Sequence, residues 1–119
     1  MRGHELNNRE KGHQFELIAA AYLRNSLDYD ILEMNYAKKT GEIDIIGREG
    51  NILCFIEVKY RKTSLYGSPE EAVSISKQLK IRKTAQFYLW EQDLPEDTEI
   101  RFDVVSILGN RIRLIRNAF

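Results

Sequence analysis

Four charged residues interrupt two short apolar runs in the stretch GEIDIIGREGNILCFIEVKYRK. Glu42 and Asp44 stand in the first run, and Glu57 and Lys59 stand in the second, where Val or Ile would pack better in a strand. If a hairpin joins the two runs, Asp44 and Glu57 come to lie on neighbouring strands. Two carboxylates at short range repel each other and are costly to desolvate, so such a pair needs a compensating cation.

A divalent metal ion would supply that cation. Mg²⁺ binds hard oxygen ligands, typically one or two carboxylates with waters and a substrate phosphate. The ion can promote phosphodiester hydrolysis by polarising the phosphoryl oxygen and by lowering the pKa of a bound water. Lys59, two residues after Glu57, could orient the attacking water and neutralise the charge that develops on phosphorus.

The alternative for these residues is a solvated sheet face whose cross-strand ion pairs each stabilise by about 0.2 to 1 kcal/mol. Leu53, Phe55 and Ile46 are expected on the same face, which favours partial burial. Burial would make such casual ion pairs costly, but the residues taken alone still favour the structural interpretation.

The surrounding segments predict the elements that hold these residues. Residues 8–25 carry apolar side chains at helical spacing, which predicts an amphipathic helix. Glu16 lies beside the apolar stripe of that helix, close enough to the core edge to face whatever the helix packs on. Taken alone, Glu16 would be a surface acid.

Three strands are predicted after this helix, at residues 29–37, 42–48 and 52–61. In the second strand, alternation puts Ile43 and Ile45 on one face and Asp44 on the other. In the third strand, Glu57 and Lys59 share a face. Glu42, at the start of its strand, could equally be exposed.

The second half of the chain predicts helix, loop and two more strands. Ser68, Pro69 and Glu71 form a helix N-terminal signal. A further helical segment, after a break near residues 74–76, has two expected faces: a buried side of Leu79, Ala85, Tyr88 and Leu89, and an outward side of Lys77, Lys80 and Lys83.

A loop at residues 93–99 precedes strands at 100–108 and 111–115, which flank a tight Gly109-Asn110 turn. On the first of these strands, Arg101 and Asp103 are expected to be a structural charge pair on the outward face. The predicted order is helix, three strands, helix, two strands, which indicates an α/β fold with a mixed sheet.

The composition fits one globular domain, with residues 1–9 as a flexible N-terminus. The chain has 119 residues and a net charge of zero, which argues against coating nucleic acid by bulk charge. No apolar stretch is long enough for a membrane span, so a cytoplasmic protein is expected. Cys54 is expected in the core, and with only two histidines the chain offers no zinc-ligand spacing.

Asp44 followed by Glu57-Val58-Lys59 resembles the PD-(D/E)xK phosphodiesterase signature shared by type II restriction enzymes and archaeal Holliday-junction resolvases. From Gly12 to Leu108, the chain is similar to the small bacterial YraN family, which is placed in that nuclease-like fold. The matching segments are Gly12 and Glu16 with AAAYL, GEIDII, FIEVKYR, YGSPEEAV, Lys77 and RFDVV.

The resemblance implies a restriction endonuclease-like core, with Asp44 and Glu57 as metal ligands and Lys59 as the catalytic lysine. It implies Glu16 as a helix-borne acid that completes the cluster, and it makes Glu42 a possible additional acid. The chain departs from the pattern at two positions. Ile43 replaces the signature's proline, and Phe15 stands where the family has a glycine.

The expected activity is therefore a nuclease dependent on Mg²⁺ or Mn²⁺ that acts on DNA, including branched or structured DNA. Arg61, Lys62, Lys77 and Lys80 are the expected contacts to the nucleic-acid backbone, although a basic helix face is by default simply solvated. The alternatives are a non-catalytic nucleic-acid-binding module with the same fold and a protein-interaction domain with structural acids. A homodimer suits the nuclease, because cutting two strands symmetrically calls for two sites.

Overall fold

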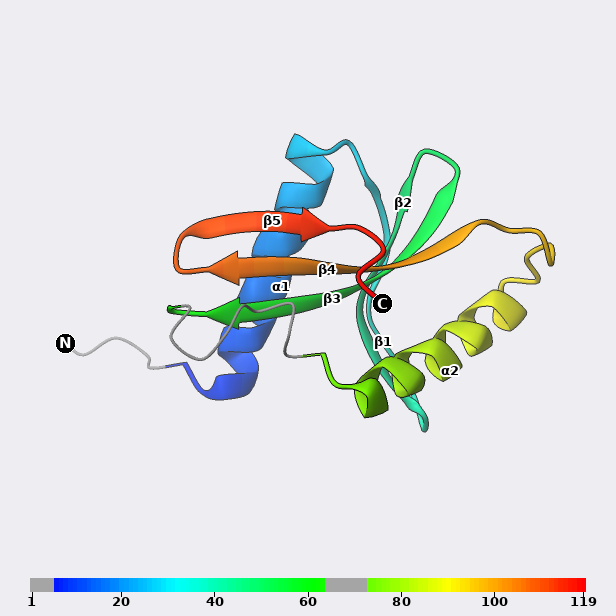
Figure 1. Ribbon diagram of the computed structural model, residues 1–119, viewed down its shortest axis with the longest axis horizontal. Helices are drawn as coiled ribbons and strands as arrows, with labels where there is room; N and C mark the ends of the chain where they lie inside the picture. Colours follow the sequence, from blue (N-terminus) through cyan, green and yellow to red (C-terminus); the bar gives the residue numbers. More distant parts are fainter. Residues whose placement is uncertain (1–5, 64–72) are drawn as a thin grey trace.

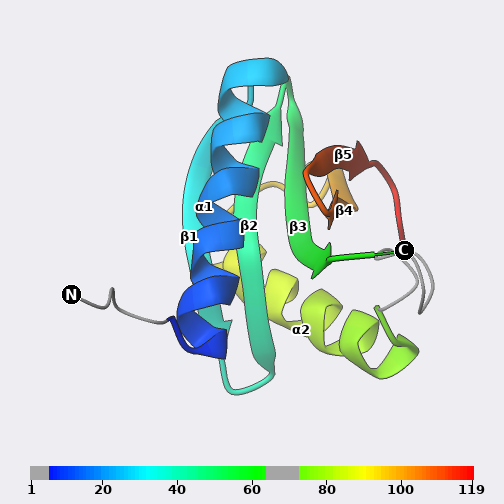
Figure 2. The ribbon, with the colours of Figure 1, turned by 90° about the vertical axis from the view of Figure 1, so that its left-hand side faces the viewer.

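The computed structural model describes residues 6–63 and 73–119. It contains a five-stranded mixed sheet in the order β1-β2-β3-β4-β5, with one helix on each face (Figures 1 and 2). The elements are α1 (Asn8–Ser26), β1 (Asp30–Lys38), β2 (Gly41–Glu49), β3 (Ile52–Arg61), α2 (Ile75–Glu91), β4 (Ile100–Leu108) and β5 (Arg111–Ile115). The predicted α/β class and element order are confirmed.

The sheet is antiparallel except between β3 and β4, which run parallel. Since parallel neighbours need a crossover, the chain leaves β3, passes through α2 and returns as β4. The acidic strands β2 and β3 are joined by a tight hairpin in which Gly50 has a φ of 59°. That hairpin is the one predicted from the sequence.

Two apolar layers hold the helices against the sheet. Helix α1 buries Ala19, Ala20 and Leu23 against residues that include Ile45 and Ile56. On the other face, α2 contributes Ile81, Ala85 and Tyr88 to a second layer. The sheet residues of this α2 layer are Tyr36, Ile43, Ile46, Leu53, Phe55 and Phe102. Each layer therefore holds one helix against one face of the sheet.

The predicted alternation along the second strand is wrong at one step. Ile45 packs in the α1 layer, whereas Ile43 packs in the α2 layer. Their cross-strand partners on β1 behave in the same way: Met34, opposite Ile45, lies against the α1 layer, and Tyr36, opposite Ile43, lies in the α2 layer. Between these two pairs, Asn35 has a φ of 55°, and this left-handed residue breaks the alternation.

The buried side of α2 also differs from the prediction. Leu79 is 55% exposed, and the buried stripe is formed by Ile81, Thr84, Ala85 and Tyr88. Thr84 was not counted because it is polar, but its hydroxyl bonds to the Lys80 carbonyl and to the Thr40 hydroxyl. The predicted helix start at Ser68 lies outside the described residues.

Helix α2 approaches the start of β2 closely at Gly41. A Cβ atom at this residue would lie 3.3 Å from the Thr84 hydroxyl and 3.3 Å from Lys80 Cβ. The first turns of α2 are therefore held beside the residues that follow Gly41, which include Glu42 and Asp44. A larger residue at position 41 would push the helix away from these acids.

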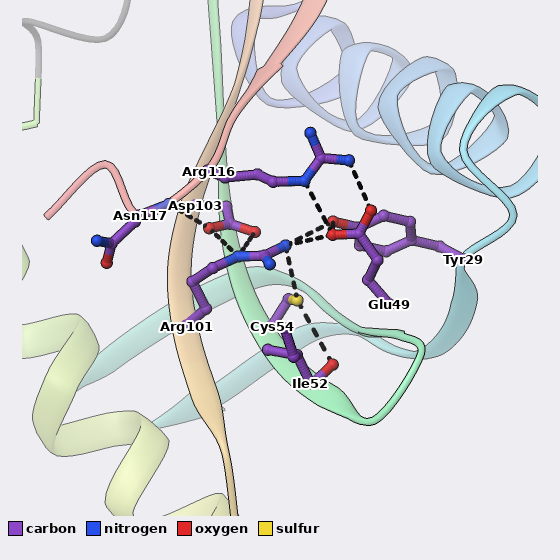
Figure 3. A network of polar contacts seen from close by, with 8 residues as sticks. All are labelled: Tyr29, Glu49, Ile52, Cys54, Arg101, Asp103, Arg116 and Asn117. Carbon is purple, nitrogen blue, oxygen red and sulfur yellow. Dashed lines mark hydrogen bonds and ion pairs between the residues drawn. The ribbon is translucent and has the colours of Figure 1, made fainter.

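Arg101 and Asp103 form the predicted structural charge pair, but they do not lie on an outward face, and that part of the prediction is wrong. Asp103 is fully buried, and its two carboxylate oxygens share the single N–H of Arg101 Nε at 2.9 and 3.0 Å (Figure 3). Arg101 also donates to Glu49 and to the Tyr29 hydroxyl. The prediction failed because both sides of β4 are covered, so the charges are tolerated only through their mutual contacts. Cys54, 3.4 Å from Arg101, is a core residue as expected.

Candidate functional site

Asp44 and Glu57 lie side by side where β2 and β3 separate. The β2–β3 ladder ends at the pair Ile45–Ile56, and the next residue on each strand is one of the two acids. Instead of continuing the ladder, the backbone N–H of Val58 donates to Asp44 Oδ2 at 2.8 Å. The hairpin therefore brings the two acids together at the point where strand pairing ends.

The pKa of Asp44 is raised from 3.8 to about 8, first by burial and then by the negative charges of Glu57 and, more weakly, of Glu16. The hydrogen bond from Val58 N–H opposes this shift. Since a shifted carboxyl prefers to be neutral, Asp44 gains most from a cation placed nearby.

Glu57 is only 4% exposed, and two lysines face one of its carboxylate oxygens. Lys77 Nζ lies 2.7 Å from Glu57 Oε1, and Lys59 Nζ lies 3.7 Å from the same atom. The second oxygen, Oε2, is buried and has no hydrogen-bond partner among the described residues. Glu57 is thus only partly satisfied by the protein.

The pKa values of the two lysines shift in opposite directions. Burial lowers the pKa of Lys59, with a further lowering from the charge of Lys77. Burial also acts to lower the pKa of Lys77, but its contacts with Glu57 outweigh this and raise it. The prediction that Lys77 faces outward is wrong for its ammonium group, because the buried carboxylate draws it back to the sheet.

Glu16 and Glu42 complete the acidic cluster from the α1 side. One carboxylate oxygen from each of Glu16, Glu42 and Asp44 lies within 4.8 Å of the other two, an arrangement that could hold a metal ion. Asn35 Nδ2 connects them, since it donates to Glu16 Oε1 at 2.7 Å and to Glu42 Oε1 at 3.0 Å. Phe15, at the family's glycine position, stacks on Tyr60 with a ring separation of 3.7 Å, and Glu16 still reaches the sheet.

Two clefts meet at Glu42. One has a volume of about 410 Å³ and is bordered by the start of α2; its lining includes Asp44, Ser76, Lys77 and Lys80. The other has a volume of about 990 Å³ and lies between the first half of α1 and β1, with Arg9, His13, Glu16 and Asn35 among its lining residues. The acidic cluster is therefore open to solvent-borne ligands from both sides of β2.

The four residues predicted to contact a nucleic-acid backbone are not all equally near these acids. Lys80 lines the smaller cleft with Lys77. Arg61 follows the acidic strand, and its Nε is buried without a hydrogen-bond partner among the described residues. Lys62 lies one residue beyond the strand and is exposed.

Sequence reasoning missed two cations that the strand register adds. Lys59 pairs with Ser106 of β4, which in turn pairs with Arg113 of β5. One step along, Arg61 is connected through Leu108 to Arg111 in the same way. Because paired residues on neighbouring strands share a face, these four cations lie on the face that carries Glu57. The alternation in RIRLI was the available signal, but it gave no indication of which face the arginines would take.

The structure thus gathers Glu16, Glu42, Asp44, Glu57 and Lys59 around the end of the β2–β3 ladder. Glu42 belongs to the cluster of three acids, whereas Glu57 is not part of that cluster and is held by Lys59 and Lys77. Asn35 is the further member that the sequence analysis did not identify. The sequence held no signal for it, because Asn35 falls at a polar position between Met34 and Tyr36.

Comparison with known proteins places the whole chain in one family. Residues 15–107 match the family model described as "Uncharacterised protein family UPF0102". A UPF0102 protein of Lachnoclostridium phytofermentans is 49% identical over 114 residues, which cover 96% of each chain. A UPF0102 protein of Clostridium botulinum is 45% identical over 118 residues, which cover 94% of this chain and 95% of the relative. This chain therefore belongs to the uncharacterised protein family UPF0102, and the predicted YraN-family resemblance is confirmed.

Proposed function

We propose that this protein is a metal-dependent nuclease that hydrolyses phosphodiester bonds in DNA, including branched or structured DNA. The observation that carries the proposal is the convergence of Asp44 with Glu16 and Glu42, next to Glu57 and its lysines. Acids with a purely structural role would each be expected to form an ion pair with a cation. Here Glu57 Oε2 has no partner within the described part of the chain, and the pKa of Asp44 is strongly raised.

The donor set fits Mg²⁺ or Mn²⁺. Every candidate ligand is a carboxylate, and hard divalent cations prefer oxygen ligands. The ligands at hand are Asp44, Glu16 and Glu42 on one side and the free oxygen of Glu57 on the other. When bound, the ion would polarise the phosphate and lower the pKa of a coordinated water.

Lys59 is the residue placed to assist the chemical step. Its ammonium group lies beside Glu57, where it can orient the attacking water and stabilise negative charge on the phosphoryl oxygens. Water attacks phosphorus, the bond to the leaving oxygen breaks, and the strand is cut. Lys77 competes for the same carboxylate and neutralises it before metal binds.

The cation distribution supports a nucleic-acid substrate. Lys77 and Lys80 line a cleft that ends at the acids, and Arg61, Arg111 and Arg113 lie on the sheet face that carries Glu57. Positive side chains of this kind contact phosphates and position a strand without reading its sequence. A chain of zero net charge can therefore still hold a nucleic acid at this one region. Neither described helix has the length and apolar character needed to span a membrane.

The Lys59→Ala variant tests catalysis separately from binding. Cleavage of labelled duplex, flapped, branched and single-stranded DNA is followed with Mn²⁺, and binding is measured with Ca²⁺ in its place. We expect Lys59→Ala to lower the cleavage rate by about 100-fold or more while the Kd changes by less than about threefold. Lys83→Ala, which removes an exposed lysine of α2, should change neither quantity.

Two results would contradict the proposal. If no DNA form is cleaved by wild-type protein with bound Mn²⁺, the protein is not a nuclease for these substrates. If Lys59→Ala instead weakens binding and no turnover is seen, the non-catalytic nucleic-acid-binding module becomes the better description. Unfolding curves for each variant exclude loss of folding as the cause.

A further inference from the structure

Asn35 occupies an unusual place in the middle of β1. It has a φ of 55°, in the left-handed region that residues other than glycine rarely adopt within a strand. Its side-chain nitrogen donates to one oxygen of Glu16, from α1, and to one oxygen of Glu42, from β2. A single amide therefore connects two acids that come from different elements.

The backbone at Asn35 determines where its side chain can reach. The strand pairs on its two sides, Met34–Ile45 and Tyr36–Ile43, pack on opposite faces of the sheet. The break in alternation thus coincides with the residue that binds the acids. Strained positions of this kind persist where the surrounding structure holds them, and they cluster at functional sites.

We propose that Asn35 is a positioning residue of the metal centre, which gathers Glu16 and Glu42 so that Glu42 acts as a ligand together with Asp44. This inference rests on the proposed function for the identity of the ion. An NH₂ group has two hydrogens, so it can satisfy one oxygen of each carboxylate while the remaining oxygens stay available. As a neutral donor, Asn35 holds the two acids without cancelling the negative charge that attracts the ion.

The test is calorimetric titration of Mn²⁺ into wild type, Asn35→Gly and Asn117→Gly, each with and without a short DNA duplex. Glycine accepts a positive φ, so Asn35→Gly removes the amide while the backbone stays acceptable. Asn117 also has a φ of 55°, and its contact to Asp103 uses only the backbone N–H, which glycine keeps. Asn117→Gly is therefore the matched control for the change in chain flexibility.

We expect Asn35→Gly to weaken Mn²⁺ binding by about 10- to 100-fold, the usual effect of losing a group that orients metal ligands, and Asn117→Gly to leave it unchanged. In EDTA, Asn35→Gly should lower the urea midpoint more than Asn117→Gly, because it also loses the hydrogen bonds to Glu16 and Glu42. Asn35→Asp should lower it further, because a third carboxylate then faces Glu16 and Glu42. That excess loss should disappear in Mn²⁺.

The proposal is overturned if Asn35→Gly binds Mn²⁺ within about twofold of wild type, or if Asn117→Gly weakens binding equally. Absence of Mn²⁺ binding by wild type, with and without duplex, also overturns it. If the affinities change as expected but no DNA is cleaved, the role of Asn35 stands and the nuclease proposal fails. The two ideas can therefore be judged separately.

Discussion

Replacing Asp44 by Asn should stabilise the metal-free protein and abolish its response to metal. In the folded state the pKa of Asp44 is about 8, against 3.8 for the ordinary carboxyl. Between these values the folded state keeps a proton that the unfolded state releases, so stability falls by about 1.4 kcal/mol for each pH unit of increase. At neutral pH the accumulated cost reaches roughly 4 kcal/mol.

An Asn side chain at position 44 cannot ionise and removes this cost, while its oxygen can still accept from Val58 N–H. At neutral pH the folded Asp44 is already mostly protonated, so the amide replaces a neutral acceptor and the change in this hydrogen bond offsets little of the gain. We therefore expect Asp44→Asn to raise the free energy of unfolding by about 2 to 4 kcal/mol at neutral pH in EDTA.

Urea unfolding followed by circular dichroism, from about pH 5 to about pH 8, measures this effect. In EDTA the wild type should lose stability as pH rises through this window, and Asp44→Asn should show a flatter profile. Saturating Mn²⁺ should raise the wild-type midpoint and leave that of Asp44→Asn unchanged. Asp28→Asn, the same change at an exposed aspartate, should follow the wild type in every respect.

Two results would refute this reasoning. One is an Asp44→Asn variant less stable than wild type in EDTA near neutral pH, which would mean that Asp44 is stabilised as an ion. The other is an equal shift of both midpoints by Mn²⁺, which would place the metal elsewhere.

Further predictions concern the cations that hold buried acids. Lys77→Ala should lower the free energy of unfolding in EDTA by about 1 to 2 kcal/mol, because Glu57 loses its 2.7 Å ion pair with a half-exposed lysine. Calorimetry should show tighter Mn²⁺ binding by this variant. Weaker Mn²⁺ binding would contradict the competition between Lys77 and metal. Arg101→Leu should cost about 3 to 5 kcal/mol in urea unfolding, since Asp103 is fully buried, and should leave Mn²⁺ affinity unchanged. A loss below about 1 kcal/mol would show that Asp103 does not depend on Arg101.

The sequence predicted the elements well because their signals are local. The helical spacing of the first segment, the hairpin between the acidic strands and the final turn all involve residues close in the chain. Burial was harder to predict where a polar residue entered the core. Thr84 and Asp103 are both fully buried, and each is satisfied by partners far away in sequence as well as nearby.

The sequence by itself indicated that Asp44, Glu57 and Lys59 would meet, because the hairpin signal brings their strands together, although the alternation predicted around Asp44 was wrong. It also suggested Glu16 as a participant through the family resemblance. Only the tertiary structure decided that Glu42 joins the cluster, that Asn35 binds it to Glu16, and that Lys77 turns inward to Glu57. Those contacts depend on how two helices dock on opposite faces of one sheet and on a single left-handed residue, and neither is encoded in short-range periodicity.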